Sequence, residues 1–154
     1  MIKPRNNMPP TNTAPATYEP KLEDWLQNIL ESYHGTSGTV HLFENGGLRL
    51  ATAINIPPQV QQVVAWVPNG KGMAGLALER KEPIHTCNLQ EDSSGNVKPG
   101  AKAVNAQAAV AVPAFDSQGD VRAVIGIAFQ EEREFTGVEL EDLLAAAATL
   151  PEAV

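Results

Sequence analysis

Residues 67–88 read VPNGKGMAGLALERKEPIHTCN, and this stretch says most about the fold of the 154-residue chain. A glycine-rich turn over 68–72 opens directly into a short helix, predicted over about 73–80. Pro83 ends that helix, and an apolar strand over 84–87 follows at once. A glycine-rich turn lets a backbone approach a ligand closely, and the start of a helix directs unpaired N–H groups toward it. The stretch therefore predicts one wall of a pocket for a small molecule.

The residues before this stretch predict a helix, a β-hairpin and a second helix. The first helix is expected over about 20–35, because apolar residues recur there every three or four positions. The hairpin has predicted strands at 39–44 and 48–54 around the turn 45–47, whose Asn-Gly pair is typical of a hairpin. The second helix is expected over about 59–66.

The residues after it predict a loop, a second hairpin and a last helix. The loop, 88–106, is polar, whereas the hairpin strands at 108–115 and 121–129 are almost continuously apolar, as in central strands covered on both faces. The last helix begins at Thr136, which forms the S/T-x-x-E pattern of a capping box with Glu139.

The bulk properties of the chain predict one domain, residues 20–154, behind a flexible Pro-rich N-terminal tail, residues 1–19. No apolar run approaches the ~20 residues that cross a bilayer, and no signal peptide is recognisable. The single cysteine, Cys87, fits a reducing compartment, so a cytoplasmic location is expected. The net charge of −7 without a basic cluster argues against nucleic acid and membranes as partners.

Four segments resemble the sequence pattern of GAF domains, and together they reach across roughly 21–150. They are ENGGLRLATAIN (44–55), VPNGKGMAGLALERKEPI (67–84), VPAFDSQGDVRAVIGIAF (112–129) and FTGVELEDLLAAAA (135–148). The resemblance implies an α+β, GAF-like fold with a central antiparallel sheet. It places the N- and C-terminal helices on one face of the sheet and a ligand pocket, roofed by a short helix and a loop, on the other.

The function implied by the resemblance is that of a stand-alone, non-catalytic sensor in signal transduction. It would bind a small metabolite or anion without a cofactor and signal through a partner protein or a homodimer. The residues expected to bind the ligand are Trp66, Met73, Ala74, Gly75, His85, Cys87 and, on the first strand, His41.

Two alternatives within the family stay open from the sequence. One is a ligand-free scaffold that only dimerises and binds protein, although the alanine-rich late strands favour a cavity because they leave space. The other is a small-anion receptor, similar to the nitrate receptors of the family, since basic residues occur in or near the predicted roof: Lys71, Lys98, Lys102 and Arg49.

Other kinds of site are weighed on the same residues. Residues 70–75 match G-x-G-x-x-G, but a dinucleotide site needs a βαβ unit, and antiparallel hairpins dominate here. His85 and Cys87 share a strand face and resemble a base and nucleophile or two metal ligands. With no further cysteine and no metal-ligand spacing, they are interpreted as packed or pocket-lining residues, and no metal is expected.

Some stand-alone GAF proteins are free methionine-(R)-sulfoxide reductases, which makes that enzyme the obvious catalytic alternative. The resemblance implies a cysteine inside the glycine turn, where this chain has Ala74, and further cysteines in the following loop, where 88–107 has none. The reaction needs one thiolate to attack the sulfoxide and a second thiol to resolve the product. The chain is therefore expected not to be an enzyme.

Overall fold

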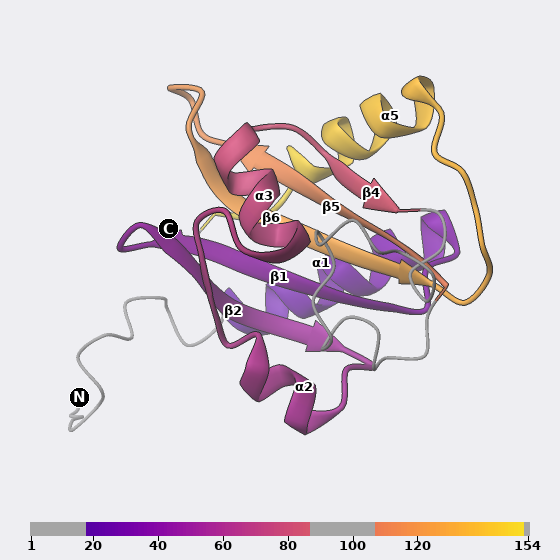
Figure 1. Ribbon diagram of the computed structural model, residues 1–154, viewed down its shortest axis with the longest axis horizontal. Helices are drawn as coiled ribbons and strands as arrows, with labels where there is room; N and C mark the ends of the chain where they lie inside the picture. Colours follow the sequence, from indigo (N-terminus) through magenta and orange to yellow (C-terminus); the bar gives the residue numbers. More distant parts are fainter. Residues whose placement is uncertain (1–17, 87–106, 153–154) are drawn as a thin grey trace.

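The computed structural model describes residues 18–86 and 107–152, which form a six-stranded antiparallel sheet with helices on both faces (Figure 1). The order of the strands in the sheet is β3-β2-β1-β6-β5-β4. The strands are β1 (Ser37–Glu44), β2 (Gly47–Ile54), β3 (Trp66–Pro68), β4 (Ile84–Thr86), β5 (Ala108–Phe115) and β6 (Val121–Phe129). The two predicted hairpins, β1–β2 and β5–β6, are joined side by side through β1 and β6. This confirms the predicted GAF-like α+β fold.

The helices of the described residues are α1 (Tyr18–Tyr33), α2 (Pro58–Val63), α3 (Gly72–Arg80) and α5 (Gly137–Ala147). The first and last of them, α1 and α5, lie against the same face of the sheet and contact each other. There the Tyr33 hydroxyl of α1 donates a hydrogen bond to the Asp142 carbonyl oxygen of α5 at 3.3 Å, and the indole Nε1 of Trp25 donates one to Thr149 Oγ1, just after α5, at 2.9 Å. Helix α3 lies on the opposite face of the sheet (Figure 1). No helix in the described part of the chain is long and apolar enough to cross a membrane.

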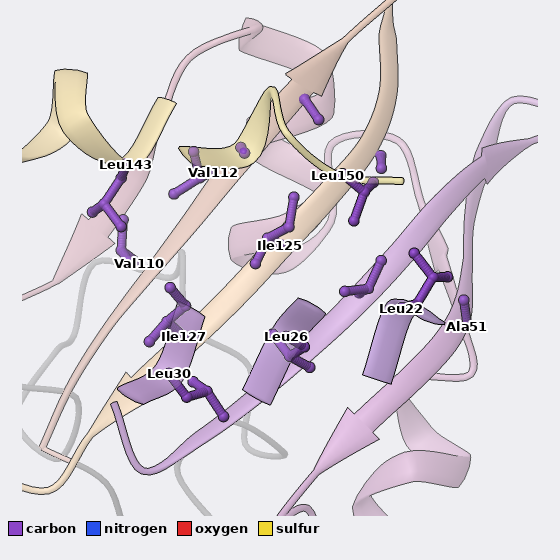
Figure 2. Close-up of a cluster of buried hydrophobic side chains, with 14 of the residues drawn as sticks. Leu22, Leu26, Leu30, Ala51, Val110, Val112, Ile125, Ile127, Leu143 and Leu150 are labelled. Carbon is purple, nitrogen blue, oxygen red and sulfur yellow. The ribbon is translucent and has the colours of Figure 1, made fainter. Parts of the chain in front are cut away.

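The larger hydrophobic core lies between the sheet and the α1–α5 layer. Figure 2 shows Leu22, Leu26 and Leu30 of α1 against side chains of the central strands, with Leu143 of α5 and Leu150 beside them. The strand side of this core is made of Val40, Ala51, Ala108, Val110, Val112, Ala114, Ala123, Ile125, Ile127 and Phe129. The apolar stripe of the predicted first helix is thus the face by which α1 covers the sheet.

The smaller hydrophobic core lies under α3. Leu76, Ala77 and Leu78 of this helix pack with Leu48 and with four further strand residues: Ile84, Ala111, Val121 and Val124. This core covers only part of its sheet face, because α3, with nine residues, is too short to cross the whole sheet. The remaining part of the face, toward α2, is where the cavity described below lies.

The turn between β1 and β2 has two residues in the left-handed region, Asn45 at φ 53° and Gly46 at φ 81°. Two-residue turns of this conformation match the twist of an antiparallel hairpin, and Asn-Gly is the sequence that adopts them most readily. The predicted hairpin is confirmed, with Gly47 as the first residue of β2.

Two boundaries differ from the sequence prediction. The predicted second helix ends at Val63 instead of residue 66, and Trp66–Pro68 form β3, which pairs with β2 at the sheet edge. Valines suit a strand as well as a helix, and the pairing that decides between them is distant in sequence. Helix α1 begins at Tyr18, so the last two residues given to the tail are helical. The predicted loop at 88–106 lies outside the described residues, and so does Cys87.

Candidate ligand-binding cavity

A cavity of about 510 Å³ lies on the α3 face of the sheet, between the central strands, α2 and the start of α3. Its floor consists of small residues on three neighbouring strands. Two rows of directly paired positions cross β5, β6 and β1, namely Ala111–Gly126–Thr39 and Ala109–Ala128–Ser37. Directly paired positions in a sheet face the same side. The space exists because none of these six side chains is larger than threonine.

Gly126 sets the position of the Thr39 hydroxyl on this floor. A Cβ atom at residue 126 would lie 2.7 Å from Thr39 Oγ1, so the hydroxyl lies directly over the glycine. Any larger side chain at position 126 would displace it. The floor therefore offers two hydroxyls, those of Thr39 and Ser37, among otherwise apolar groups.

The walls of the cavity are apolar and come from both sides of the floor. Residues of and around α2 form one wall: Ile56, Val60, Val63 and Val64. Val67, Pro68, Met73 and Ala74 form the opposite wall, where β3 leads through the turn into α3. Lys71 is the one charged side chain among the described lining residues, and it is exposed. The site is thus built to enclose mostly apolar surface.

His41 is the polar side chain buried most deeply in the lining, at 3% exposed. Its Nε2 lies 2.8 Å from the carbonyl oxygen of Val64. A carbonyl only accepts, so Nε2 carries the proton and donates, and the neutral ring leaves Nδ1 as an acceptor. Among the described residues, this Nδ1 is the buried side-chain nitrogen or oxygen that has no hydrogen-bond partner.

Burial lowers the pKa of His41 below its ordinary value of 6.5, because removing the ring from water disfavours the charged form. The hydrogen bond to Val64 acts in the opposite direction and is the weaker effect. The imidazole is therefore neutral at physiological pH, in agreement with the tautomer assigned from the hydrogen bond.

Gly75, a predicted ligand-binding residue, supports the turn instead of lining the cavity. A Cβ atom there would lie 2.5 Å from the Pro68 oxygen and 3.2 Å from the backbone of Gly70. The Gly70 N–H donates to the Gly75 carbonyl at 2.9 Å, which ties the turn to the helix. The glycine is thus needed for close approach of two backbone segments of the protein itself.

Four of the predicted residues, His41, Trp66, Met73 and Ala74, border the cavity. The structure places His85 elsewhere. Strand residues alternate between faces, so with Ile84 buried under α3 the next residue points the other way. The His85 ring lies against Phe135 with centroids 5.4 Å apart. Cys87 lies outside the described residues.

Trp66 borders the cavity, but its indole ring lies elsewhere. A Cβ atom on Gly47 would be 2.4 Å from Trp66 Cζ2, so the ring covers that glycine. Trp66 pairs with Arg49, and both Arg49 and Gly47 face away from Leu48 and the α3 side. Trp66 was predicted to bind the ligand, and it borders the cavity without its indole ring forming a wall.

The basic residues considered for an anion site do not gather at the cavity. Arg49 is bonded to Glu44 at 3.0 Å and is not among the lining residues, whereas Lys71 is exposed at its border. Lys98 and Lys102 lie outside the described residues. Within the described residues no cluster of His, Cys, Asp or Glu is arranged to hold a metal ion.

Three of the floor residues, Ala109, Ala111 and Ala128, belong to the alanine-rich strands that the sequence predicted to leave space, but none of the six was predicted to bind the ligand. Small residues occur at alternate positions of both late strands, at 109 and 111 and at 126 and 128. A period of two places each pair on one face of its strand. Which face holds the cavity follows only from the packing of α1 and α3.

A curled antiparallel sheet with terminal helices on one face and a short helix beside a cavity on the other is the architecture of GAF-type domains. A model of the GAF domain matches residues 22–151, and the chain belongs to the GAF domain family. GAF domains are typically ligand-binding regulatory domains. No curated protein matches the chain significantly.

Solved structures with the same fold come from proteins of different function. The GAF domain of a phosphoenolpyruvate-protein phosphotransferase from Coxiella burnetii is similar with a TM-score of 0.72 and 19% identity, over 89% of this chain and 82% of that one. A type II free methionine-R-sulfoxide reductase from Thermoplasma acidophilum has a TM-score of 0.71 and 16% identity, over 86% and 88%. The free methionine-R-sulfoxide reductase from Neisseria meningitidis has a TM-score of 0.65 and 16% identity, over 86% of this chain and 81% of that one.

These reductases contradict the prediction that the chain is not an enzyme. The prediction was based on missing cysteines at Ala74 and in 88–107, which tests one arrangement of thiols and says nothing of other chemistry in the cavity. The fold occurs in enzymes as well as in sensor domains. At 16% identity the likeness shows the fold alone, and it assigns this chain neither a reaction nor the lack of one.

Proposed function

We propose that the cavity binds a small organic molecule and that this binding is the primary function of the domain. The observation that supports the proposal is a space of about 510 Å³ that the described side chains leave beside a well-packed core. Protein interiors are normally filled to the density of organic crystals. Sites for small ligands are concave, mostly apolar and in the range of about 300–1,000 Å³, with a few polar groups that fix orientation.

The floor residues argue for a ligand over a ligand-free scaffold. A scaffold would gain stability from larger residues at positions such as Ala109 or Ala128, since these would fill the space and add apolar contacts. The chain instead has glycine, alanine, serine and threonine at all six floor positions. This pattern favours a function that requires the space.

The effect of binding would pass through the α1–α5 layer to a partner protein or to a second copy of the chain. This part of the proposal is supported by a single sheet separating the two sides. Val110 and Ile127 have side chains in the α1–α5 core while bordering the cavity. A ligand that shifts β5 or β6 would therefore act directly on the side chains beneath α1 and α5.

The experiment is a ligand screen with one cavity-filling variant and a matched control. Neutral aromatic and aliphatic compounds, with 2-naphthol as the reference probe, are titrated against the wild-type chain by fluorescence and by thermal shift. Ala109→Leu places a larger side chain on the cavity floor, whereas Ala145→Leu makes the same change at an exposed position of α5. We expect binding to persist in Ala145→Leu and to be lost in Ala109→Leu, with circular dichroism showing both folded.

Two results would overturn the proposed function. One is a complete absence of binding across the screen. The other is equal binding by wild-type and Ala109→Leu protein, which would place the bound compounds outside the cavity.

A further inference from the structure

We infer that the cavity binds an uncharged, mostly apolar molecule with one hydrogen-bonding group, and that this group pairs with the hydroxyl of Thr39 on β1. The inference rests on the proposed function and specifies both the chemical class of the ligand and the side chain that orients it. It is carried by the open surface of the floor, by a hydroxyl without a partner and by the scarcity of charge in the lining.

The cavity reaches the side chain of Thr39. The next residue, Val40, is buried in the larger core beneath α1, so Thr39 points to the opposite face of the sheet, where it lines the cavity. Thr39 and its floor neighbours Gly126 and Ala128 are only half-buried, although they lie on the two central strands of the sheet. Their exposed surface therefore opens into the cavity.

The hydroxyl of Thr39 has no hydrogen-bond partner in the described part of the chain. It differs in this setting from Nδ1 of His41, which also lacks a partner but is enclosed by protein. A hydroxyl both donates and accepts, so it can pair with a ligand hydroxyl, amide or carbonyl group. A ligand that covered Thr39 with apolar surface alone would exclude water from the oxygen without replacing its hydrogen bond, which weakens binding.

The rest of the floor suits the apolar body of such a ligand. Ala109, Ala111 and Ala128 present methyl groups, and burial of apolar surface against them favours binding. Ser37, the other floor residue with a hydroxyl, is less open than Thr39, because it is 5% exposed. The floor thus has one readily accessible hydroxyl, which matches a ligand with one polar group.

The charges around the cavity argue against an anion. Lys71 is the charged side chain that borders the cavity in the described part of the chain, and it is exposed to water. An anion inside would lose its hydration without a buried cation from these residues to replace it. His41 offers no charge either, since burial lowers its pKa and keeps the ring neutral. An uncharged ligand avoids this cost.

The test uses pairs of compounds in which a methyl group replaces the hydroxyl at nearly constant shape. The pairs are 2-naphthol with 2-methylnaphthalene and 1-naphthol with 1-methylnaphthalene, which carry the polar group at different positions of the ring. The quantity measured by fluorescence titration is the ratio of the two Kd values within a pair. Because this ratio is compared between proteins, the different hydrophobicity of the two compounds cancels.

Three variants assign the preference for the hydroxyl compound to Thr39. Thr39→Val replaces the hydroxyl by a methyl group, and we expect the preference to fall about tenfold in at least one pair, since an unpaired polar group costs about this factor. Thr39→Ser keeps the hydroxyl and should retain most of the preference. Thr52→Val is the matched control, because Thr52 is a half-buried strand residue that does not border the cavity.

NMR of the wild-type protein tests the same contact without a substitution. With ¹³C-labelled threonine methyl groups, the Thr39 methyl resonance should shift when either member of a pair binds, because the aromatic ring lies beside it. The Thr136 methyl resonance, from the start of α5, should stay in place. An unchanged Thr39 resonance with bound probe would overturn the inference.

The outcomes separate this inference from the proposed function. If both pairs keep their wild-type ratios in Thr39→Val while binding is lost in Ala109→Leu, the inference is wrong and the proposed function stands. Tighter binding of the anion 2-naphthoate than of 2-naphthol would have the same meaning. Absence of binding by every probe would overturn both.

Discussion

Gly75 and Gly137 both lie near the start of a helix, yet their surroundings differ in a way that can be measured. A Cβ atom at Gly75 would lie 2.5 Å from the Pro68 oxygen, whereas a Cβ atom at Gly137 would meet nothing within 4 Å. We expect Gly75→Ala to lower the free energy of unfolding by about 1–3 kcal/mol, because backbone must move to admit the methyl group. Gly137→Ala is expected to raise it by up to about 1 kcal/mol through lower entropy of the unfolded chain.

Urea denaturation followed by circular dichroism gives both values under one set of conditions. Since the two changes add the same methyl group to a helix, a general effect of alanine cancels between them. Equal stability of Gly75→Ala and the wild-type protein would show that the turn over 68–72 moves freely from α3, contrary to the close contact described above.

The pKa of His41 makes a prediction about stability and pH. Because burial lowers its pKa in the folded state below 6.5, the unfolded chain binds more protons at mildly acidic pH. The contribution of the neutral His41 ring to the free energy of unfolding is therefore complete above a pH of about 6.5. It is lost progressively as the pH falls below that value. Of the other described lining residues only Lys71 is charged.

We expect the stability difference between the wild-type protein and His41→Phe to become smaller from pH 7.5 to pH 5.5. Chemical denaturation at several pH values measures it, and His34 and His85, which both proteins share, cancel in the comparison. Parallel stability curves for the two proteins would contradict the assignment of a lowered pKa to this residue.

At the scale of the element, the start of α5 is held by reciprocal hydrogen bonds. Thr136 Oγ1 accepts from the Glu139 N–H at 3.1 Å, and the Thr136 N–H donates to Glu139 Oε1 at 3.2 Å. The bond from the Thr136 backbone, followed by that from Arg133, lowers the pKa of the Glu139 carboxyl. We expect Thr136→Ala to reduce the free energy of unfolding by about 1 kcal/mol, and Thr136→Ser to preserve most of it, since serine keeps the accepting oxygen.

Thermal unfolding of the three proteins at neutral pH tests the cap. Its contribution is local, so the two substitutions should leave probe binding at the distant cavity unchanged. A Thr136→Ser variant as unstable as Thr136→Ala would show that the threonine methyl group, and not its hydroxyl, stabilises this end of the helix.

Helix caps and hairpin turns were predictable because the residues that form them are close in sequence. The capping box of α5 and the Asn45-Gly46 turn each depend on residues fewer than five positions apart. Strand β3 was missed because it forms only by pairing with β2, nearly twenty residues earlier in the chain. Its Val67 fits a helical spacing with the preceding valines equally well.

The candidate site was predictable in part, for the same reason. Met73 and Ala74 follow from the glycine turn, which is local, and they border the cavity. The positions of His85 and of the Trp66 ring depend on which face of the sheet each strand residue occupies. A shift of one residue exchanges the faces, and only the packing of α1 and α3 decides the matter.

At the scale of the whole molecule, the sheet separates a face that provides stability from a face that holds the cavity. Leu26, fully buried, packs between α1 and the sheet, whereas Ala109 lies on the cavity floor. We expect Leu26→Ala to lower the free energy of unfolding by about 2–5 kcal/mol, because it leaves a void in the larger core. The affinity for 2-naphthol should change by less than about threefold, since the mutated side chain does not border the cavity.

Ala109→Leu is expected to show the opposite behaviour. Its larger side chain enters space that the protein does not fill, so the free energy of unfolding should change by less than about 1 kcal/mol while 2-naphthol binding is lost. Urea denaturation gives the free energy of unfolding of Leu26→Ala and Ala109→Leu, and fluorescence titration gives the affinity of each for 2-naphthol. A large loss of affinity in folded Leu26→Ala protein would mean that the two faces are coupled through the sheet. In that case Val110 and Ile127, which border the cavity while packing in the larger core, would be the first residues to substitute.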